Sequence, residues 1–237
     1  MIKQEILNGK IKVITFDAVK GNMLDIDDLI SFANVIANDK KDQLIEGIII
    51  TGANRSFCTG VKAFSIEGKE DFSIFRILDE LLFDLFVFPK PLVVAATGHS
   101  IGGGLLIQMC ADFIVMSENM KIKVGFPELK LNTTLDSFMT CLIEYSVGNH
   151  RKIQDLIYTS EYIQPEAALL YRLTDAIVQE IDVFETALDK LMKLISYNAI
   201  VFRESKLSMR SSTVERMHYC IDKKCYEVFN NLFITND

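Results

Sequence analysis

The chain has 237 residues, of which 49% are hydrophobic and 24% charged. This composition supplies a sizeable core and excludes wholesale disorder, and the length predicts one large α/β domain with a terminal extension. Lysine and arginine number 25 against 32 acidic residues, so the net charge of −7 argues against generic binding to nucleic acid backbones.

Cysteine and histidine are scattered along the chain. The five cysteines form no CxxC pair and the three histidines do not cluster with them, so no metal site is predicted. Unpaired thiols and an N-terminus unlike a signal peptide predict a cytoplasmic protein. Residues 91–111 carry no formal charge and reach the length of a membrane span, but the glycines in their middle favour a buried strand, a turn and a buried helix.

The first half of the chain alternates between strand and helix patterns, which predicts crossover βα units. The predicted strands are residues 11–16, 45–51, 92–96, 113–116 and 121–124, and the predicted helices are residues 25–38, 72–86 and 103–112. Asp25 is expected to cap the first helix. After Pro127 the pattern is mainly helical, over residues 135–147, 151–158, 165–171, 183–197 and 212–233, and this helical excess suggests oligomerisation.

Three segments are candidates for chemistry, and each also has a plain structural interpretation. The first, Ser56-Phe57-Cys58-Thr59-Gly60-Val61, follows a predicted buried strand. Glycine at its bend allows backbone N–H groups to point at a ligand; the alternative is an ordinary turn.

The second segment is Gly98-His99-Ser100-Ile101-Gly102-Gly103-Gly104-Leu105, between a predicted strand and helix. Its spacing matches neither a Walker A loop nor a dinucleotide fingerprint, which favours an anion or oxyanion site over a phosphate cradle. Tight strand–helix packing is the alternative.

The third segment is Val124-Gly125-Phe126-Pro127-Glu128-Leu129-Lys130, with Asp136 eight residues beyond Glu128. Apolar neighbours would desolvate Glu128 and raise its pKa toward the range of a general base. The alternatives are an exposed loop glutamate and a helix-capping aspartate.

In this order the three segments resemble the motifs of the crotonase superfamily, the enoyl-CoA hydratase/isomerase family. Phe57-Cys58-Thr59-Gly60-Val61-Lys62 is similar to its FCAGAD turn, residues 97–104 to its NGxxxGGG segment, and Gly125-Phe126-Pro127-Glu128 to its FGxPE segment. Gly21-Asn22-Met23-Leu24 resembles a further family segment, so the likeness extends over most of residues 1–180.

The resemblance implies a spiral of ββα units in a core over residues 1–180 and a helical trimerisation region over residues 181–237, in trimers or hexamers. It implies an acyl thioester substrate on coenzyme A, or on a carrier protein, with no other cofactor, no membrane partner and a place in fatty acid metabolism. The N–H groups of Val61 and Gly103 would form an oxyanion hole, and Glu128 and Asp136 would be catalytic. The implied substrate-binding residues are Asn22, Met23, Cys58, Thr59, Gly60, Lys62, Gly102, Leu106 and Pro127. Lys20 and Lys206 are candidates to contact coenzyme A phosphates, against the alternative of solvated charges.

One departure from the family narrows the reaction. Hydratases of the family use two glutamates, and Leu106 stands where the first would be. One carboxylate can move a proton from carbon to carbon, so the sequence favours an enoyl-CoA isomerase. The alternatives are a hydratase, another enolate enzyme such as a decarboxylase or carbon–carbon bond former, and a homologue that binds acyl thioesters without catalysis.

Overall fold

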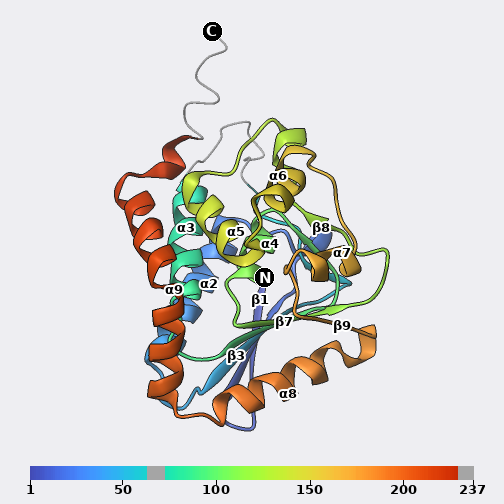
Figure 1. Cartoon of the computed structure of the whole chain (residues 1–237). Helices are drawn as coiled ribbons and strands as arrows, with labels where there is room; N and C mark the ends of the chain where they lie inside the picture. Colours follow the sequence, from blue (N-terminus) through green and yellow to red (C-terminus); the bar gives the residue numbers. More distant parts are fainter. Residues whose placement is uncertain (63–72, 229–237) are drawn as a thin grey trace.

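The computed structural model describes residues 1–62 and 73–228 (Figure 1). The strands are β1 Ile2–Leu7, β2 Ile11–Phe16, β3 Gly47–Gly52, β4 Ser56–Cys58, β5 Leu92–Ala96, β6 His99–Ile101, β7 Phe113–Ser117, β8 Val124–Gly125 and β9 Ala176–Val178. The α-helices are α1 Val19–Asn22, α2 Ile26–Lys41, α3 Ser73–Phe86, α4 Gly103–Met109, α5 Ser137–Val147, α6 His150–Tyr158, α7 Pro165–Leu170, α8 Val183–Ile195 and α9 Ala199–Asp222. Short 3-10 helices cover η1 Glu128–Leu131, η2 Glu180–Asp182 and η3 Cys225–Glu227.

A six-stranded sheet in the order β1-β2-β3-β5-β7-β9 forms the body of the molecule. Its strands are parallel except β1, which pairs antiparallel with β2. Every residue of β3 is buried because both faces of the sheet are covered, as its continuous apolar run predicted. Ile49 faces the cluster formed with α8, and Ile48 and Ile50 face the larger cluster formed with α2 and α3.

A second, parallel sheet contains β4, β6 and β8. Each of these short strands directly follows a strand of the large sheet, and the first two are followed by α3 and α4. Successive ββα turns therefore send one strand to each sheet, which confirms the predicted α/β spiral. The small sheet collects the chain segments that follow β3, β5 and β7, and these carry the three candidate motifs.

Helices cover the large sheet on both faces (Figure 1). On one face α8 packs through Val183, Ala187 and Leu191 against β3, β5 and β7. On the other face α2, α3, α4 and α5 contribute to one continuous apolar core. The predicted boundary at residue 180 falls between β9 and α8, and the division of the chain there stays a prediction.

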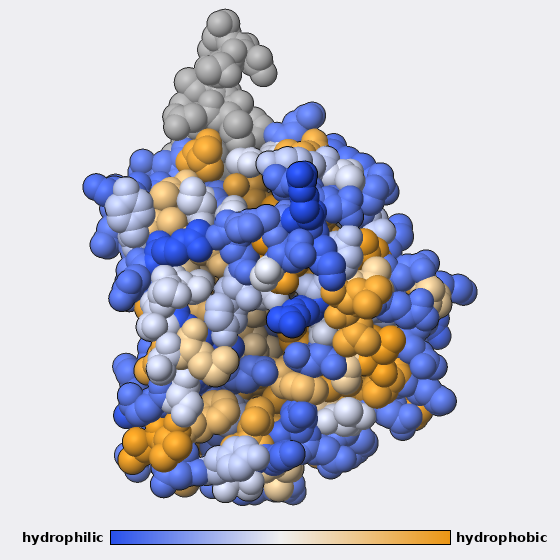
Figure 2. Space-filling view, viewed as in Figure 1, coloured by the Kyte–Doolittle hydropathy of each residue, from blue (hydrophilic) through white to orange (hydrophobic). Residues whose placement is uncertain are grey.

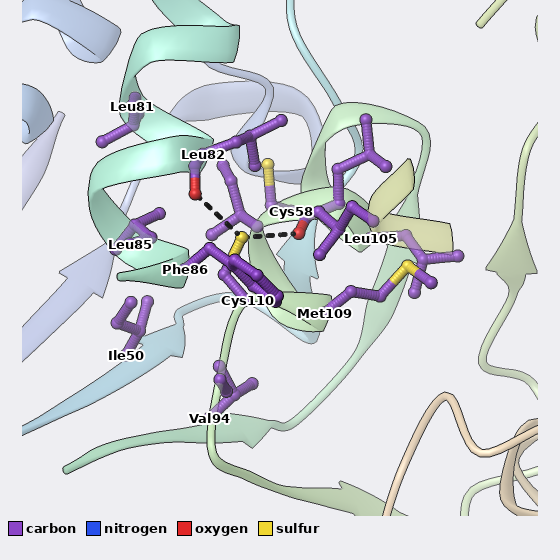
Figure 3. Close-up of a cluster of buried hydrophobic side chains, with 14 of the residues drawn as sticks. Ile50, Cys58, Leu81, Leu82, Leu85, Phe86, Val94, Leu105, Met109 and Cys110 are labelled. Carbon is purple, nitrogen blue, oxygen red and sulfur yellow. Dashed lines mark hydrogen bonds between the residues drawn. The ribbon is translucent and has the colours of Figure 1, made fainter. Parts of the chain in front are cut away.

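Packing at the C-terminal end of α4 joins this helix to α3. Figure 3 shows Cys110, the residue after α4, among apolar side chains of α3 and of the large sheet. Its thiol donates to the carbonyl oxygens of Leu82 and Leu106, both at 3.4 Å. Burial raises the pKa of Cys110 to about 12, so this group stays a thiol and serves packing.

The later helices differ from the sequence prediction at their ends. The long helix α9 begins at Ala199, thirteen residues before the predicted start at 212. The apolar residues of α9 are spread around the helix and form no single stripe, so the sequence pattern did not predict its first half. Residues 229–233 of that prediction lie outside the described part of the chain. The prediction of Asp25 as a cap is confirmed, since its carboxylate accepts from the Asp28 amide at 2.9 Å.

The uncharged segment at residues 91–111 becomes β5, β6 and α4, and within residues 1–62 and 73–228 no helix has the length and apolarity to cross a bilayer.

Figure 2 shows apolar side chains gathered on the right of the molecular face in view, where α7 lies in Figure 1. Leu170 on α7 is 70% exposed and Ile200 at the start of α9 is 64% exposed. Assembly into a trimer or hexamer stays a prediction.

Candidate active site

Two backbone amides from distant parts of the sequence meet at the end of the small sheet. Val61 follows β4 and forms a β-bridge with Leu24, and Gly103 begins α4. A Cβ placed on Gly103 would lie 3.6 Å from the Val61 nitrogen, which shows how closely the two backbones approach. Within the described residues neither amide has a hydrogen-bond acceptor. The structure therefore brings the two amides of the predicted oxyanion pair together, with no acceptor for either in the described part of the chain.

Glycine is required at two positions of this turn. Gly102 has φ +53° and ψ −126°, a conformation that residues with a Cβ rarely adopt. A Cβ on Gly104 would lie 2.2 Å from the carbonyl oxygen of Cys58, so glycine alone lets α4 approach β4. The glycine run thus serves both interpretations raised by the sequence: tight packing, and exposure of the Gly103 amide.

Glu128 begins η1 directly after Pro127 and places its carboxylate beside the turn. Its Oε1 lies 3.0 Å from the position that a Cβ on Gly102 would occupy. Its Oε2 is buried, with no hydrogen-bond partner among the described residues. Burial raises the pKa of Glu128 to about 7, so a large fraction is ionised near neutral pH and the carboxylate is a competent general base.

A cavity of about 140 Å³ joins these groups. Glu128 is the single ionisable side chain among the described residues that line it, and the other walls are mostly apolar. The lining consists of Met23, Thr59, Gly60, Val61, Phe75, Leu78, Ile101, Gly102, Gly103, Leu106, Pro127, Glu128, Leu131, Thr133, Thr134, Leu135 and Met139. Leu106 occupies this wall, so no second carboxylate enters the cavity from α4.

The cavity lining contains six of the nine predicted substrate-binding residues, namely Met23, Thr59, Gly60, Gly102, Leu106 and Pro127. The other three, Asn22, Cys58 and Lys62, are not among the lining residues. Lys62 is exposed beside the turn, and its amide donates to the carbonyl oxygen of Leu24 at 2.8 Å. Substrate contact by these three stays a prediction without support from the lining.

Asn22 and Cys58 instead hold the first turn in place. The Asn22 amide group donates to the carbonyl oxygens of Ala53 at 2.8 Å and Ser56 at 2.7 Å, and its side-chain oxygen accepts from the Ala18 amide. Cys58 is fully buried, and burial raises the pKa of its thiol to about 12. Both residues therefore position the backbone that presents Val61.

Asp136 has a different environment from Glu128. It caps α5 by accepting from the Met139 amide at 2.8 Å and is not among the cavity-lining residues. It also lies close enough to Asp79 of α3, a residue that the sequence analysis did not single out, for the two carboxyl groups to affect each other's pKa. Within the described residues, Oδ1 of Asp79 and Oδ2 of Asp136 are buried without a hydrogen-bond partner. Burial, and then the charge of Asp136, raise the pKa of Asp79 to about 10, so Asp79 is protonated at neutral pH.

Asp79→Asn is expected to flatten the dependence of stability on pH. The raised pKa of Asp79 means that the folded protein keeps a proton which the unfolded chain releases, so wild-type stability falls as pH rises from 3.8 toward about 10. Asparagine still offers Asp136 a donor but does not titrate. Urea denaturation at about pH 6 and about pH 9 should show a smaller loss of unfolding free energy in the variant; equal losses would contradict the raised pKa of Asp79.

Two further observations bear on cofactors. In residues 1–62 and 73–228 no three histidine, cysteine or acidic side chains are grouped as a metal site. Lys206, a candidate for a coenzyme A phosphate, is buried and pairs with Asp112 at 2.8 Å. The alternative of a solvated charge is therefore wrong, and contact with a coenzyme A phosphate stays a prediction without support. The side chain of Lys20 lies outside the described part.

The sequence of this chain is similar to those of known enoyl-CoA enzymes. The model of the enoyl-CoA hydratase/isomerase family matches residues 7–232. A short-chain-enoyl-CoA hydratase from Clostridium acetobutylicum is 30% identical over 207 residues, which cover 84% of this chain and 77% of the relative. A carnitinyl-CoA dehydratase from Escherichia coli K12 is 27% identical over 195 residues, which cover 80% and 72% of the two chains.

Solved structures share the fold at lower identity. A probable enoyl-CoA hydratase from Mycobacterium tuberculosis aligns with a TM-score of 0.88 at 22% identity, covering 99% of both chains. The human mitochondrial delta3-delta2-enoyl-CoA isomerase aligns with a TM-score of 0.90 at 19% identity, covering 98% of this chain and 92% of the isomerase. The chain therefore belongs to the enoyl-CoA hydratase/isomerase family of the crotonase superfamily.

Proposed function

We propose that this protein is an enoyl-CoA isomerase that moves a double bond of an acyl thioester through an enolate, with Glu128 as its base. The observation that carries the proposal is one cavity in which Glu128 is the single carboxylate among the described lining residues. The same cavity contains two backbone amides that have no acceptor within residues 1–62 and 73–228. Leu106 supports isomerisation over hydration because adding water across a double bond is harder with one acid–base group.

The geometry suggests a sequence of proton transfers. The thioester oxygen of a 3-enoyl substrate accepts hydrogen bonds from the Val61 and Gly103 amides. The Glu128 carboxylate removes a proton from C2, and the electron pair forms a dienolate whose negative charge these amides stabilise, at about 3 kcal/mol per donor. Glu128 then returns the proton to C4, so the double bond moves from C3–C4 to C2–C3 and no atom is gained or lost.

Asp136 has no step in this proposal. Its carboxylate caps α5 and interacts with Asp79, so it fixes the helix that contributes Met139 to the cavity. Coenzyme A enters the scheme as the thiol half of the substrate, and no other cofactor is needed because the reaction is a net proton shift.

The purified protein is expected to convert 3-enoyl-CoA into 2-enoyl-CoA. The ultraviolet absorbance of the conjugated thioester measures this conversion. Separate assays would add 2-enoyl-CoA to detect hydration and malonyl-CoA to detect decarboxylation. Isomerisation alone is the expected result. Hydration or decarboxylation as the faster reaction would overturn the proposal in favour of that activity, and binding of acyl-CoA without turnover would favour a non-catalytic homologue.

The isomerisation rate should depend on pH through Glu128. The base must be ionised, and burial raises its pKa to about 7. We expect kcat/KM to rise about tenfold per pH unit below that value and to level off above it. A profile that stays flat down to about pH 5 would contradict Glu128 as the base.

A further inference from the structure

The size of the cavity limits what the acyl group can be. The cavity includes the oxyanion amides and Glu128 at its reactive end, and its volume is about 140 Å³. An apolar cavity of about 150 Å³ accommodates benzene, which is about six carbon atoms. An acyl chain whose carbonyl sits between Val61 and Gly103 therefore fills the available space at about six carbons.

The charge of the cavity sets a second limit. Glu128 is its only ionisable side chain among the described residues, and no lysine, arginine or histidine of that part lines it. A second carboxylate on the acyl chain would lie near Glu128 with no cation to neutralise either group, and burying such a charge is strongly unfavourable. The site is therefore suited to an uncharged acyl chain.

The part of the apolar wall formed by Leu78, Leu106 and Met139 has little freedom to give way. Leu78, Leu106 and Met139 are 1%, 1% and 2% exposed, and they come from three helices packed together: α3, α4 and α5. The backbone of Met139 is held in addition by Asp136, whose carboxylate accepts from the Met139 amide at 2.8 Å. A longer chain would have to displace these buried side chains, and densely packed interiors resist such changes.

We infer that the substrates are uncharged short-chain enoyl thioesters with up to about six acyl carbons, and that Leu106 and Met139 are the residues that set this limit. The inference rests on the proposed function for the reaction, but the chain-length limit itself is a property of binding.

Binding of saturated acyl-CoA thioesters tests the chain-length limit separately from the proposed reaction. Butanoyl-, hexanoyl-, octanoyl- and dodecanoyl-CoA undergo no isomerisation, so calorimetry with them measures the cavity alone. Affinity should rise about fourfold for each added methylene up to hexanoyl-CoA. The affinity for octanoyl- and dodecanoyl-CoA should be at least about tenfold lower than that for hexanoyl-CoA. Glutaryl-CoA, which carries a terminal carboxylate, should bind at least about tenfold more weakly than hexanoyl-CoA.

Enlarging the wall tests the two named residues. Met139→Ala and Leu106→Ala should each shift the preferred ligand from hexanoyl- to octanoyl-CoA or longer. Met209→Ala, a matched change at a methionine that is 77% exposed on α9, should keep the preference of the wild type. Circular dichroism shows whether each variant is folded. If one of the two wall variants does not fold, the ligand preference of the other tests the chain-length inference.

The outcomes distinguish the two proposals. Equal affinity from butanoyl- to dodecanoyl-CoA, or folded wall variants with unchanged preference, would overturn the chain-length inference even if isomerisation occurs. A limit at hexanoyl-CoA in a protein that isomerises no 3-enoyl-CoA would support the inference and overturn the proposed reaction.

Discussion

Glu128→Gln is expected to lower the kcat of isomerisation by about 10²–10⁴-fold, because glutamine fills the same space but accepts no proton. The Val61 and Gly103 amides remain in place, so substrate binding and KM should change little. Single-turnover assays with 3-enoyl-CoA measure the loss. Glu166→Gln is a matched control, since Glu166 is exposed on α7 and outside the cavity lining.

The same substitution should stabilise the protein above neutral pH. Burial raises the pKa of Glu128 from 4.5 to about 7, so the folded state holds a proton that the unfolded chain loses, and stability falls as pH rises between those values. Glutamine does not titrate and so removes this loss. The unfolding free energy of the variant should exceed that of the wild type by up to about 3 kcal/mol at about pH 8 and by nothing at about pH 4. Lower activity with higher stability is a combination that damage to the fold does not produce. A variant with unchanged kcat would overturn the role of Glu128, and one destabilised at high pH would contradict its desolvation.

The sequence predicted the site best where backbone geometry decides. The strand before each glycine-rich turn is a continuous apolar run, and the glycines mark positions where chain segments approach closely. The meeting of Val61 and Gly103 follows from the spiral, in which β4 and β6 are neighbours. Spacing alone could not show it, because a contact between parallel strands across a helical crossover leaves no local pattern.

The sequence was less informative about polar residues that act by burial. Asn22 and Asp136 were predicted to contact substrate or reactants, yet both bond backbone groups near the site. Asp79 was not singled out, although a signal existed: it lies between Leu78 and Leu81 in an otherwise strongly amphipathic helix. A carboxyl group within an apolar stripe is costly to bury unless a polar group lies near it. That neighbour is Asp136 at the N-cap of α5, which only the tertiary structure brings close to α3.

The helix α9 shows the same difficulty. Its sequence is largely polar, so helical periodicity located only its second half. Its stability depends on two buried cations, Lys206 and Arg210, that side-chain type assigns to the surface. The residue that makes their burial possible is Asp112, 94 residues before Lys206 in the chain.

Asp112→Ala is therefore expected to destabilise the protein by about 3–5 kcal/mol. The Asp112 carboxylate accepts from Lys206 Nζ at 2.8 Å, Arg210 Nη2 at 3.0 Å and the Leu92 amide at 2.9 Å. Arg210 also donates to the carbonyl oxygens of Cys110 and Ala111, both at 3.1 Å, and so connects α9 to the end of α4. Alanine would leave two buried charges without a counter-ion, and urea denaturation measures the loss of unfolding free energy.

Two comparisons test this cause. Asp84→Ala removes an exposed pair, since Asp84 and Lys40 are 42% and 41% exposed at 3.2 Å, and it should cost less than about 1 kcal/mol. Adding Lys206→Met to Asp112→Ala should recover part of the lost stability, because one uncompensated charge is replaced by an apolar chain. A cost for Asp112→Ala no larger than that of the exposed pair would show that α9 is held by its apolar contacts. A double variant less stable than Asp112→Ala would show that Lys206 contributes packing rather than a charge in need of Asp112.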